Sequence, residues 1–276
     1  MTTQPSASML SIIIVSYNAR ADLERCLESL HASPPAAPHE IIVVDNASSD
    51  GSAAAARTWS KVRVIETGAN LGFGRANNVG IRASAGEHLL MLNSDTIVPP
   101  GAIDRLIAEL TRYPDVAVVG PRLVDGEGRA ELSFGRMLGP WNEWRQKRLV
   151  RGHERRDPKI SAFVDQLTRR EQSPDWVSGA CLLVRRADAD AVGLFDERYQ
   201  MYTEDVDFCA AIRARGRRIH FTPAVEIIHL RGRSAASAPA ATREAYRRSR
   251  VAFYEKHHPL LAPLLRLYLR LRRSDT

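Results

Sequence analysis

The chain alternates short apolar runs with stretches of helical spacing, and this alternation restricts its fold more than any other feature of the sequence. The first 125 residues contain five runs rich in Ile, Val and Leu that read as buried strands: 11–17, 40–46, 62–67, 88–95 and 116–124. Helical patterns fill the intervals between them. Apolar strands joined by helices are typical of a parallel sheet covered on both faces. The sequence therefore predicts an α/β fold with a mostly parallel, Rossmann-like sheet flanked by helices.

The alternation breaks after residue 125, and the predicted organisation of the chain follows from this break. Residues 126–175 include Trp141, Trp144 and many charged residues, and they read as part helix and part loop. Excursions of this size in a compact domain tend to serve function. Regular patterns then return, with a helix predicted at 204–216 and a strand at 218–230. The expected division is a domain over 1–232, with halves at 1–125 and 126–232, followed by a C-terminal helical extension over 233–276.

The formal net charge is +7, and the excess is confined to the C-terminal end. Residues 231–276 contain 11 Arg or Lys against 3 Asp or Glu, whereas the remainder contains 28 basic and 29 acidic residues. A nearly neutral domain is poorly suited to nucleic acid, so we expect no nucleic-acid partner. The tail mixes Arg with Leu and Tyr, which favours an anionic membrane surface as a partner of residues 242–276. Packing on the domain or on a second subunit is the alternative, and a homodimer stays open.

The cysteines and the hydropathy of the chain predict its compartment. Cys26, Cys181 and Cys209 are far apart and form no CxxC pair, which is typical of reduced thiols in a cytosolic protein. No apolar run reaches the ~18 residues that a membrane-spanning helix needs. We therefore expect a cytoplasmic protein that lies peripherally on the inner face of the cell membrane.

Four successive predicted strands lead into polar side chains. In an open parallel sheet, ligands bind beyond the carboxyl ends of the strands. One polar strand end is ordinary, because turns favour Asn, Asp and Ser, but four at one edge favour a binding site. The ends contribute Ser16, Tyr17 and Asn18, then Asp45 and Asn46, then the loop 68–78, then Asn93, Ser94 and Asp95.

Asp95 is the candidate metal ligand among these residues. Mg²⁺ and Mn²⁺ are commonly held by one or two carboxylates together with phosphate oxygens of a substrate. The alternative is that Asp95 caps the helix near Gly101, although Pro99 and Pro100 intervene. His229 ends the strand at 218–230, where an imidazole opposite a metal-binding Asp would be a further ligand, and its alternative is a structural role.

A second acidic cluster opens the helix at 204–216. Glu204, Asp205 and Asp207 fall in its first turn. Acidic residues there are favourable for the helix dipole, which is the simple explanation. A carboxylate at this point would act as a general base if the fold brings it to the first cluster.

Two nucleotide-binding motifs do not account for the site. The segment GFGRAN follows the third strand and lacks a third glycine, so that it is weak evidence for a dinucleotide. No GxxxxGK[ST] motif is present in the sequence, which argues against a P-loop phosphate cradle.

Taken in order, these motifs resemble the inverting family 2 glycosyltransferases with the A-type glycosyltransferase fold, over about residues 10–232. The likeness is greatest to bacterial rhamnosyltransferases that build cell-wall linkers and surface polysaccharides. It is carried by SIIIVSYNARADLERCLESL, IIVVDNASSDGS, NLGFGRANNVGIRAS, LLMLNSDTIVPPGAI, WVSGACLLVRR and GLFDERYQMYTEDVDFCAAIRARG.

The resemblance implies a nucleotide-binding half over 1–125, an acceptor-binding half over 126–232, and a role for each matching position. The base and ribose would be held by Ser16, Tyr17, Asn18, Asp45 and Asn46. The nucleotide and diphosphate pocket would be lined by Gly72, Phe73, Arg75, Asn77, Asn93 and Ser94. The acceptor would be bordered by Trp176, Gly179, Ala180 and Glu204. Asp205 would be the catalytic base. The family's metal motif, usually Asp-x-Asp, reads Asn93-Ser94-Asp95 here, so Asp95 would carry the metal directly and His229 would reach the metal or the diphosphate.

The resemblance further implies a reaction. A Mg²⁺- or Mn²⁺-dependent enzyme would move a sugar, with L-rhamnose from dTDP-rhamnose favoured, to a hydroxyl of a lipid-linked or polysaccharide acceptor in cell-envelope glycan synthesis. One alternative is a galactofuranosyl- or other hexosyltransferase that uses a UDP-sugar. Another is a sugar nucleotidyltransferase, which should show a basic, glycine-rich loop where this chain reads SYNARAD. The third is an inactive scaffold that binds nucleotide sugars.

Overall fold

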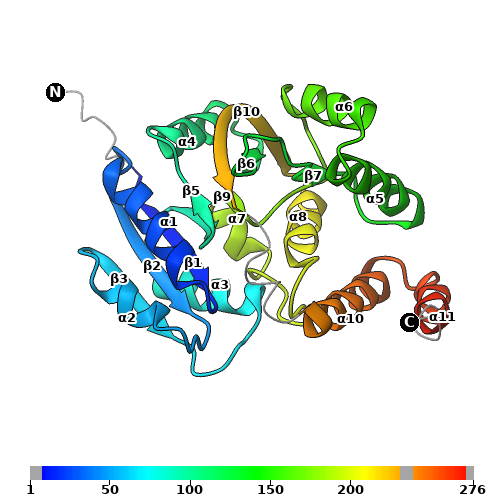
Figure 1. The fold of residues 1–276 in the computed structure, drawn as a ribbon, viewed down its shortest axis with the longest axis horizontal. Helices are drawn as coiled ribbons and strands as arrows, with labels where there is room; N and C mark the ends of the chain where they lie inside the picture. The colour runs from blue at the N-terminus through cyan, green and yellow to red at the C-terminus, as the bar shows by residue number, and fades with distance from the viewer. Residues whose placement is uncertain (1–7, 231–238, 272–276) are drawn as a thin grey trace.

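The computed structural model describes residues 8–230 and 239–271 (Figure 1). Their centre is an eight-stranded sheet with the order β3-β2-β1-β4-β9-β6-β10-β5, accompanied by a small two-stranded sheet of β7 and β8. The strands are β1 Leu10–Ser16, β2 His39–Asp45, β3 Val62–Glu66, β4 His88–Asn93, β5 Thr96–Ile97, β6 Val116–Val124, β7 Phe134–Gly135, β8 Trp176–Val177, β9 Cys181–Arg185 and β10 Arg218–His229.

The main sheet is parallel in its larger part, as predicted, with two antiparallel strands. Strands β3, β2, β1 and β4 pair in parallel, and so do β6 and β10. Strand β9 runs antiparallel between β4 and β6, and β5 runs antiparallel along the end of β10. Because β9 runs against its neighbours, it begins at the edge of the sheet where β1, β2 and β4 end.

Helices cover both faces of the sheet because successive residues of each strand point to opposite sides. In β1, Ile12 and Ile14 pack with Leu23 of one helix layer, whereas Ile13 packs with Ala76 of the other. The helices are α1 Arg20–Ala32, α2 Ser52–Arg57, α3 Phe73–Ala83, α4 Ala102–Arg112, α5 Pro140–Glu154, α6 Pro158–Thr168, α7 Arg186–Ala191, α8 Glu204–Ala214, α10 Pro239–His257 and α11 Ala262–Leu271. The three cysteines are free and buried in these layers, as core residues.

The C-terminal helices pack on the second half of the chain. A separate apolar cluster joins Tyr199 and Val206, from around the start of α8, to Phe253 and Tyr254 of α10. Figure 1 shows α10 next to α8, with α11 beyond it. The predicted boundary between residues 232 and 233 lies outside the described residues. Among the described helices, none combines the length and the apolar character needed to cross a bilayer.

Candidate active site

The predicted polar residues meet at one edge of the sheet. Ser16, Asp45 and Asn93 are the last residues of β1, β2 and β4, which pair in parallel register. His229 ends β10 at the same edge, because β6 and β10 point in the same direction as β4. Gly179 and Ala180, which directly precede β9, lie at the same edge.

Asp95 and His229 lie in contact. Strand β5 pairs with the end of β10 so that Thr96 is opposite His229, which places the preceding Asp95 beside the imidazole. His229 Nε2 lies 3.3 Å from Asp95 Oδ1 and 3.4 Å from Asn93 Nδ2. On the other side of the ring, His229 Nδ1 lies 3.2 Å from the Glu131 carboxylate. Glu131 was not predicted, because it lies in the irregular segment after residue 125.

The charges around His229 determine its protonation. Burial of the ring disfavours the imidazolium, but hydrogen bonds to Asp95 and Glu131 and the charges of both carboxylates outweigh burial and raise the pKa of His229 to about 9. With no cation bound, the ring is therefore protonated at neutral pH, and coordination of a metal by Nε2 would release that proton. A carboxylate, an imidazole and a second carboxylate behind the imidazole form the donor arrangement common around protein-bound divalent metals. The Asp95 carboxylate offers the oxygen ligand that Mg²⁺ and Mn²⁺ prefer, and His229 would add a nitrogen ligand only in its neutral form.

Three buried oxygens at the ends of β1 and β2 and in α3 are left without partners. Ser16 Oγ, Asp45 Oδ1 and Asn77 Oδ1 have no hydrogen-bond partner within residues 8–230 and 239–271. The other Asp45 oxygen, Oδ2, accepts from Ser48 N at 3.0 Å, so that Asp45 also forms the turn that is the simpler explanation for it. Because buried polar groups are normally satisfied, unpaired oxygens favour a ligand at this edge.

Asn18 and Asn46 shape the loops around these oxygens. Asn46 Oδ1 accepts from Leu71 N at 2.8 Å, which fixes the loop that leads to α3. Asn18 has a positive φ of 48°, and its Oδ1 accepts from Ser49 N at 2.8 Å. Each asparagine uses a side-chain oxygen to hold a neighbouring loop, and Tyr17 lies half-buried beside Asn18.

The start of α3 is held against the loop before α8. Gly72 has φ +83°, and a Cβ on it would lie 2.0 Å from Gln200 O. The same oxygen accepts a hydrogen bond from Phe73 N at 3.2 Å. Only glycine allows this approach, which joins the loop before α3 to the second half of the chain. Gln200 was not predicted, because no local signal links it to Gly72.

Asp205 is oriented by two backbone amides at the start of α8. Its Oδ2 accepts from Gly179 N at 2.9 Å and its Oδ1 from Val206 N at 2.8 Å. Burial raises the pKa of Asp205, although these hydrogen bonds act in the opposite direction. Its neighbour Glu204 is buried, and its Oε2 has no hydrogen-bond partner in the described part of the chain. Burial first, and then the charge of Asp205, raise the pKa of Glu204 to about 8.

The two carboxyl groups of this pair differ in the hydrogen bonds that reach their oxygens. Amide donors stabilise the ionised form of Asp205, whereas Glu204 lacks such donors on Oε2 and holds its proton more firmly. Near neutral pH, Glu204, with a pKa of about 8, therefore remains largely protonated beside Asp205.

The two predicted clusters are joined through a single dipeptide. Gly179 N donates to Asp205, and the next residue, Ala180, accepts from Asn93 N through its carbonyl at 2.9 Å. A Cβ on Gly179 would lie 3.0 Å from the ring of Phe73, so Asp205 is also next to the start of α3. Thus the general-base candidate Asp205, Asn93 at the end of β4, and Phe73 at the start of α3 all lie beside Gly179 or Ala180.

The remaining predicted residues lie at the margins of this site. Ser94 is buried between Asn93 and Asp95. Arg75 is half exposed and forms an ion pair of 3.3 Å with Glu197. Trp176, three residues before Gly179, donates from Nε1 to Arg136 O at 2.9 Å. Its ring lies against Gly135 in β7.

A hollow of about 260 Å³ lies elsewhere, between β7, α5 and α6, and is lined among others by Phe134, Arg145 and Phe163. Asp95 and Asp205 do not line it. We place the candidate site by its chemistry, which is at the sheet edge, rather than by this hollow.

Sequence comparison relates the chain to named proteins. A sequence profile described as Glycosyl transferase family 2 matches residues 11–190. The chain is 32% identical over 271 residues to N-acetylglucosaminyl-diphospho-decaprenol L-rhamnosyltransferase of Mycobacterium tuberculosis, covering 91% of this chain and 85% of that protein. It is 28% identical over 231 residues to rhamnosyltransferase WbbL of Escherichia coli K12, covering 80% and 83%.

Structure comparison supports the same fold. The mannosyltransferase PcManGT from Pyrobaculum calidifontis, solved with GDP-Man and Mn²⁺, superposes with a TM-score of 0.61 at 18% identity and covers 96% of this chain and 69% of its own. S. aureus TarS 1-349, solved with UDP-GlcNAc, gives 0.57 at 19% identity, covering 87% and 64%. At these identities the likeness shows the fold alone, and it confirms the predicted fold class.

Proposed function

The chain belongs to glycosyl transferase family 2 and is a glycosyltransferase, and from this premise we propose that it moves a sugar from a nucleoside diphosphate to a hydroxyl with inversion, using Asp205 as general base. The observation that carries the proposal is the Gly179–Ala180 connection, which holds the Asp205 carboxylate beside the strand end that bears Asn93 and Asp95.

Asp205 supplies what the acceptor requires. An alcohol has a high pKa, so that attack on the sugar needs a positioned base to remove the proton as the new bond forms. The two amides on Asp205 hold its carboxylate in one orientation and favour its ionised form. Glu204 stays protonated beside it and donates a hydrogen bond to the acceptor or the sugar. Direct displacement opposite the leaving group inverts the anomeric centre and needs no nucleophilic side chain.

Asp95 and His229 would hold the divalent cation, with Glu131 orienting the imidazole from behind. A cation there would offset the charge that develops on the departing diphosphate. Asn93 replaces the first acidic residue of the family's usual Asp-x-Asp motif, so the site carries one carboxylate fewer. Asp45 Oδ1 and Ser16 Oγ, the buried oxygens without partners, are suited to the donor's base and ribose.

The donor and the acceptor are inferred from the relatives. Both names support rhamnose as the transferred sugar, and the mycobacterial name specifies L-rhamnose. We propose dTDP-rhamnose as its donor, which the family resemblance favours. The mycobacterial name supports an acceptor of N-acetylglucosamine linked through a diphosphate to a polyprenol. The reaction would belong to cell-envelope glycan synthesis.

A transfer assay tests the proposal. The purified chain is mixed with dTDP-L-rhamnose, N-acetylglucosaminyl-diphospho-decaprenol and Mn²⁺ or Mg²⁺, and the product is identified by mass and by the anomeric configuration in NMR. We expect a rhamnosylated lipid of inverted configuration and loss of transfer in Asp205→Asn. Transfer from UDP-galactofuranose or another UDP-hexose, but not from dTDP-rhamnose, would favour the alternative hexosyltransferase. No nucleoside diphosphate release with any donor would favour the inactive scaffold.

We further propose that the C-terminal region contacts an anionic membrane at its inner face. The outer surface of α11 exposes Leu264, Leu267 and Leu271, and Arg266 and Arg270 lie between them in sequence. Stacked Trp141 and Trp144 are exposed at the start of α5. The loop between α10 and α11 lies near the start of α5, because His258 Nε2 is 2.7 Å from Leu138 O. Exposed Trp and Leu with Arg are suited to an anionic bilayer surface. Residues 272–276 of the predicted segment 242–276 lie outside the described residues.

Vesicle flotation tests this contact. The chain should float with vesicles containing anionic phospholipid and remain unbound with neutral vesicles. The triple variant Leu264→Ser, Leu267→Ser, Leu271→Ser should lose flotation. The matched control is Phe163→Ser, which changes an exposed aromatic residue on α6 and should float as the native chain does. Equal flotation of the triple variant would refute the membrane contact.

A further inference from the structure

We propose that Asp207 is a positioning residue for the catalytic base, and that Lys256 and His257 of α10 hold it in place, which makes α10 part of the catalytic apparatus. The inference rests on the proposed function, because it concerns the alignment of Asp205. It gives α10 a task in the reaction that is separate from the membrane contact proposed for α11.

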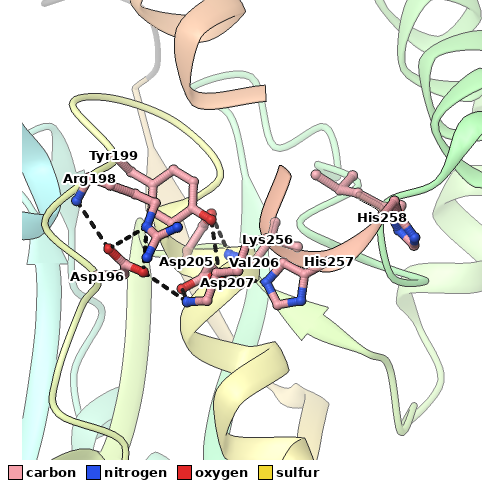
Figure 2. Close-up of polar contacts among 10 residues, drawn as sticks. Asp196, Arg198, Tyr199, Asp205, Val206, Asp207, Lys256, His257 and His258 are labelled. Atoms are coloured by element: carbon pink, nitrogen blue, oxygen red, sulfur yellow. Dashed lines mark hydrogen bonds and ion pairs between the residues drawn. The ribbon is translucent and has the colours of Figure 1, made fainter. Parts of the chain in front are cut away.

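The Asp207 carboxylate receives three donors from two distant parts of the chain (Figure 2). Its Oδ1 contacts Tyr199 Oη at 3.1 Å and His257 Nε2 at 2.6 Å, and its Oδ2 accepts from Lys256 Nζ at 2.8 Å. The side chain is only 2% exposed. A buried carboxylate needs compensating donors, so the contact with α10 is tight and specific rather than a surface ion pair.

Lys256 joins both ends of the segment that leads to the catalytic pair. Its Nζ also donates to Asp196 Oδ2 at 2.8 Å, and Asp196 in turn accepts from Arg198. Figure 2 shows the ammonium group of Lys256 between the two aspartates. One ammonium group therefore fixes residue 196, where the segment begins, and residue 207, in the first turn of α8.

The segment between these points carries strain that needs support. Tyr202 and Thr203 have φ angles of 65° and 68°, a region that residues with side chains rarely adopt. Thr203 O then accepts from Asp207 N at 2.8 Å, so the first helical turn that bears Asp205 begins on strained backbone. Strained backbone persists where the surroundings over-determine it, and it is typical of functional sites. The Asp207 contacts supply that support two residues from the base.

A simpler role would be the attachment of α10 to the domain. A second buried carboxylate, Glu143 of α5, also contacts α10: it accepts a hydrogen bond from Tyr254 Oη at 2.7 Å and forms an ion pair with Arg250 Nε at 2.7 Å. Among the described residues, the side-chain partners of Glu143 are Lys147 on α5 and Tyr254 and Arg250 on α10, and none belongs to α8 or the segment before it. Both Glu143 and Asp207 attach α10 to the domain, but of the two only Asp207 would also align Asp205. Variants of the two residues can therefore distinguish attachment from alignment.

The experiment compares Asp207→Asn and Lys256→Met with the matched control Glu143→Gln, using the transfer assay above. We expect all three to lower the melting temperature. Only Asp207→Asn and Lys256→Met should lower kcat, by tenfold or more, with the KM for donor and the calorimetric Kd for dTDP unchanged within twofold. Lys256→Arg, which keeps a cation able to reach both aspartates, should recover most of kcat. Hydrogen–deuterium exchange should rise in residues 196–207 in the two test variants and not in Glu143→Gln.

Two results would overturn the inference. One is a folded Lys256→Met with native kcat and native exchange in residues 196–207. The other is Glu143→Gln that loses kcat as much as Asp207→Asn does, which would reduce the contact to helix attachment. If the unmutated protein transfers no sugar, that result counts against the proposed function and not against this contact. The exchange measurement would still test the contact, because unchanged exchange in residues 196–207 of the variants would refute it.

Discussion

Replacement of Gly72 by Ala tests how the two halves of the site are joined. Gly72 has φ +83° and ψ 171°, a region that is essentially restricted to glycine. The added Cβ would lie 2.0 Å from Gln200 O and 2.8 Å from Gln200 C, which are backbone atoms that cannot rotate away. The loop before α3 and the loop before α8 must therefore separate.

The expected destabilisation follows from these contacts. A side chain in this backbone region costs about 1–3 kcal/mol. Separation of the loops also removes the hydrogen bond from Phe73 N to Gln200 O, for about 1 kcal/mol more. The total is about 2–4 kcal/mol, which in a chain of this size lowers the melting temperature by roughly 5–15 °C.

Gly68→Ala is the matched control in the same loop. Gly68 has φ +72°, but an added Cβ meets no atom within 4 Å, so only backbone strain is introduced. We expect Gly68→Ala to lower the melting temperature by less than half as much in a thermal unfolding series. Equal shifts for the two variants would refute the steric argument, because strain alone would then explain both.

The remaining predictions concern the acidic residues. Asp205→Asn should lower kcat by about 10²–10⁴-fold while leaving dTDP binding nearly intact in calorimetry; ordinary turnover would contradict its role as base. Asp95→Ala should weaken Mn²⁺-dependent binding of the nucleotide by about tenfold or more, and unchanged affinity in calorimetry would exclude it as a ligand. For Glu204, a folded pKa raised to about 8 means that the native state holds a proton that the unfolded state releases. Its stabilising contribution is therefore complete below about pH 4.5 and declines as the pH rises to 8, by at most about 1.4 kcal/mol per unit. The advantage of Glu204→Gln over the native chain in denaturant unfolding should grow over that interval, and a constant difference would show that Glu204 is ionised.

The sequence by itself determined the framework of the sheet. Residues 11–17, 40–46 and 116–124 form strands within a residue of the prediction, because continuous apolar runs report burial on both faces. The polar ends of β1, β2 and β4 were also legible, since parallel strands connected by helices end at one edge. The apolar runs thus indicate that these strands are buried, and the helices between them indicate that the strands run in the same direction.

Tertiary structure alone decided which residues face one another. Strand β9 runs antiparallel to β4, and this places Gly179, just before the strand, against Asp205. An apolar run in the sequence indicates a strand but not the direction in which it runs. Glu131 reaches His229 across 98 positions, and Lys256 reaches Asp207 across 49, so that neither pair leaves a periodic trace in the sequence. Asp207 illustrates the difference. Its place in the first turn of a helix suggested a favourable interaction with the helix dipole. In the structure, Asp207 is buried against α10 and bound by Lys256 and His257, and the sequence does not show which distant segments pack together.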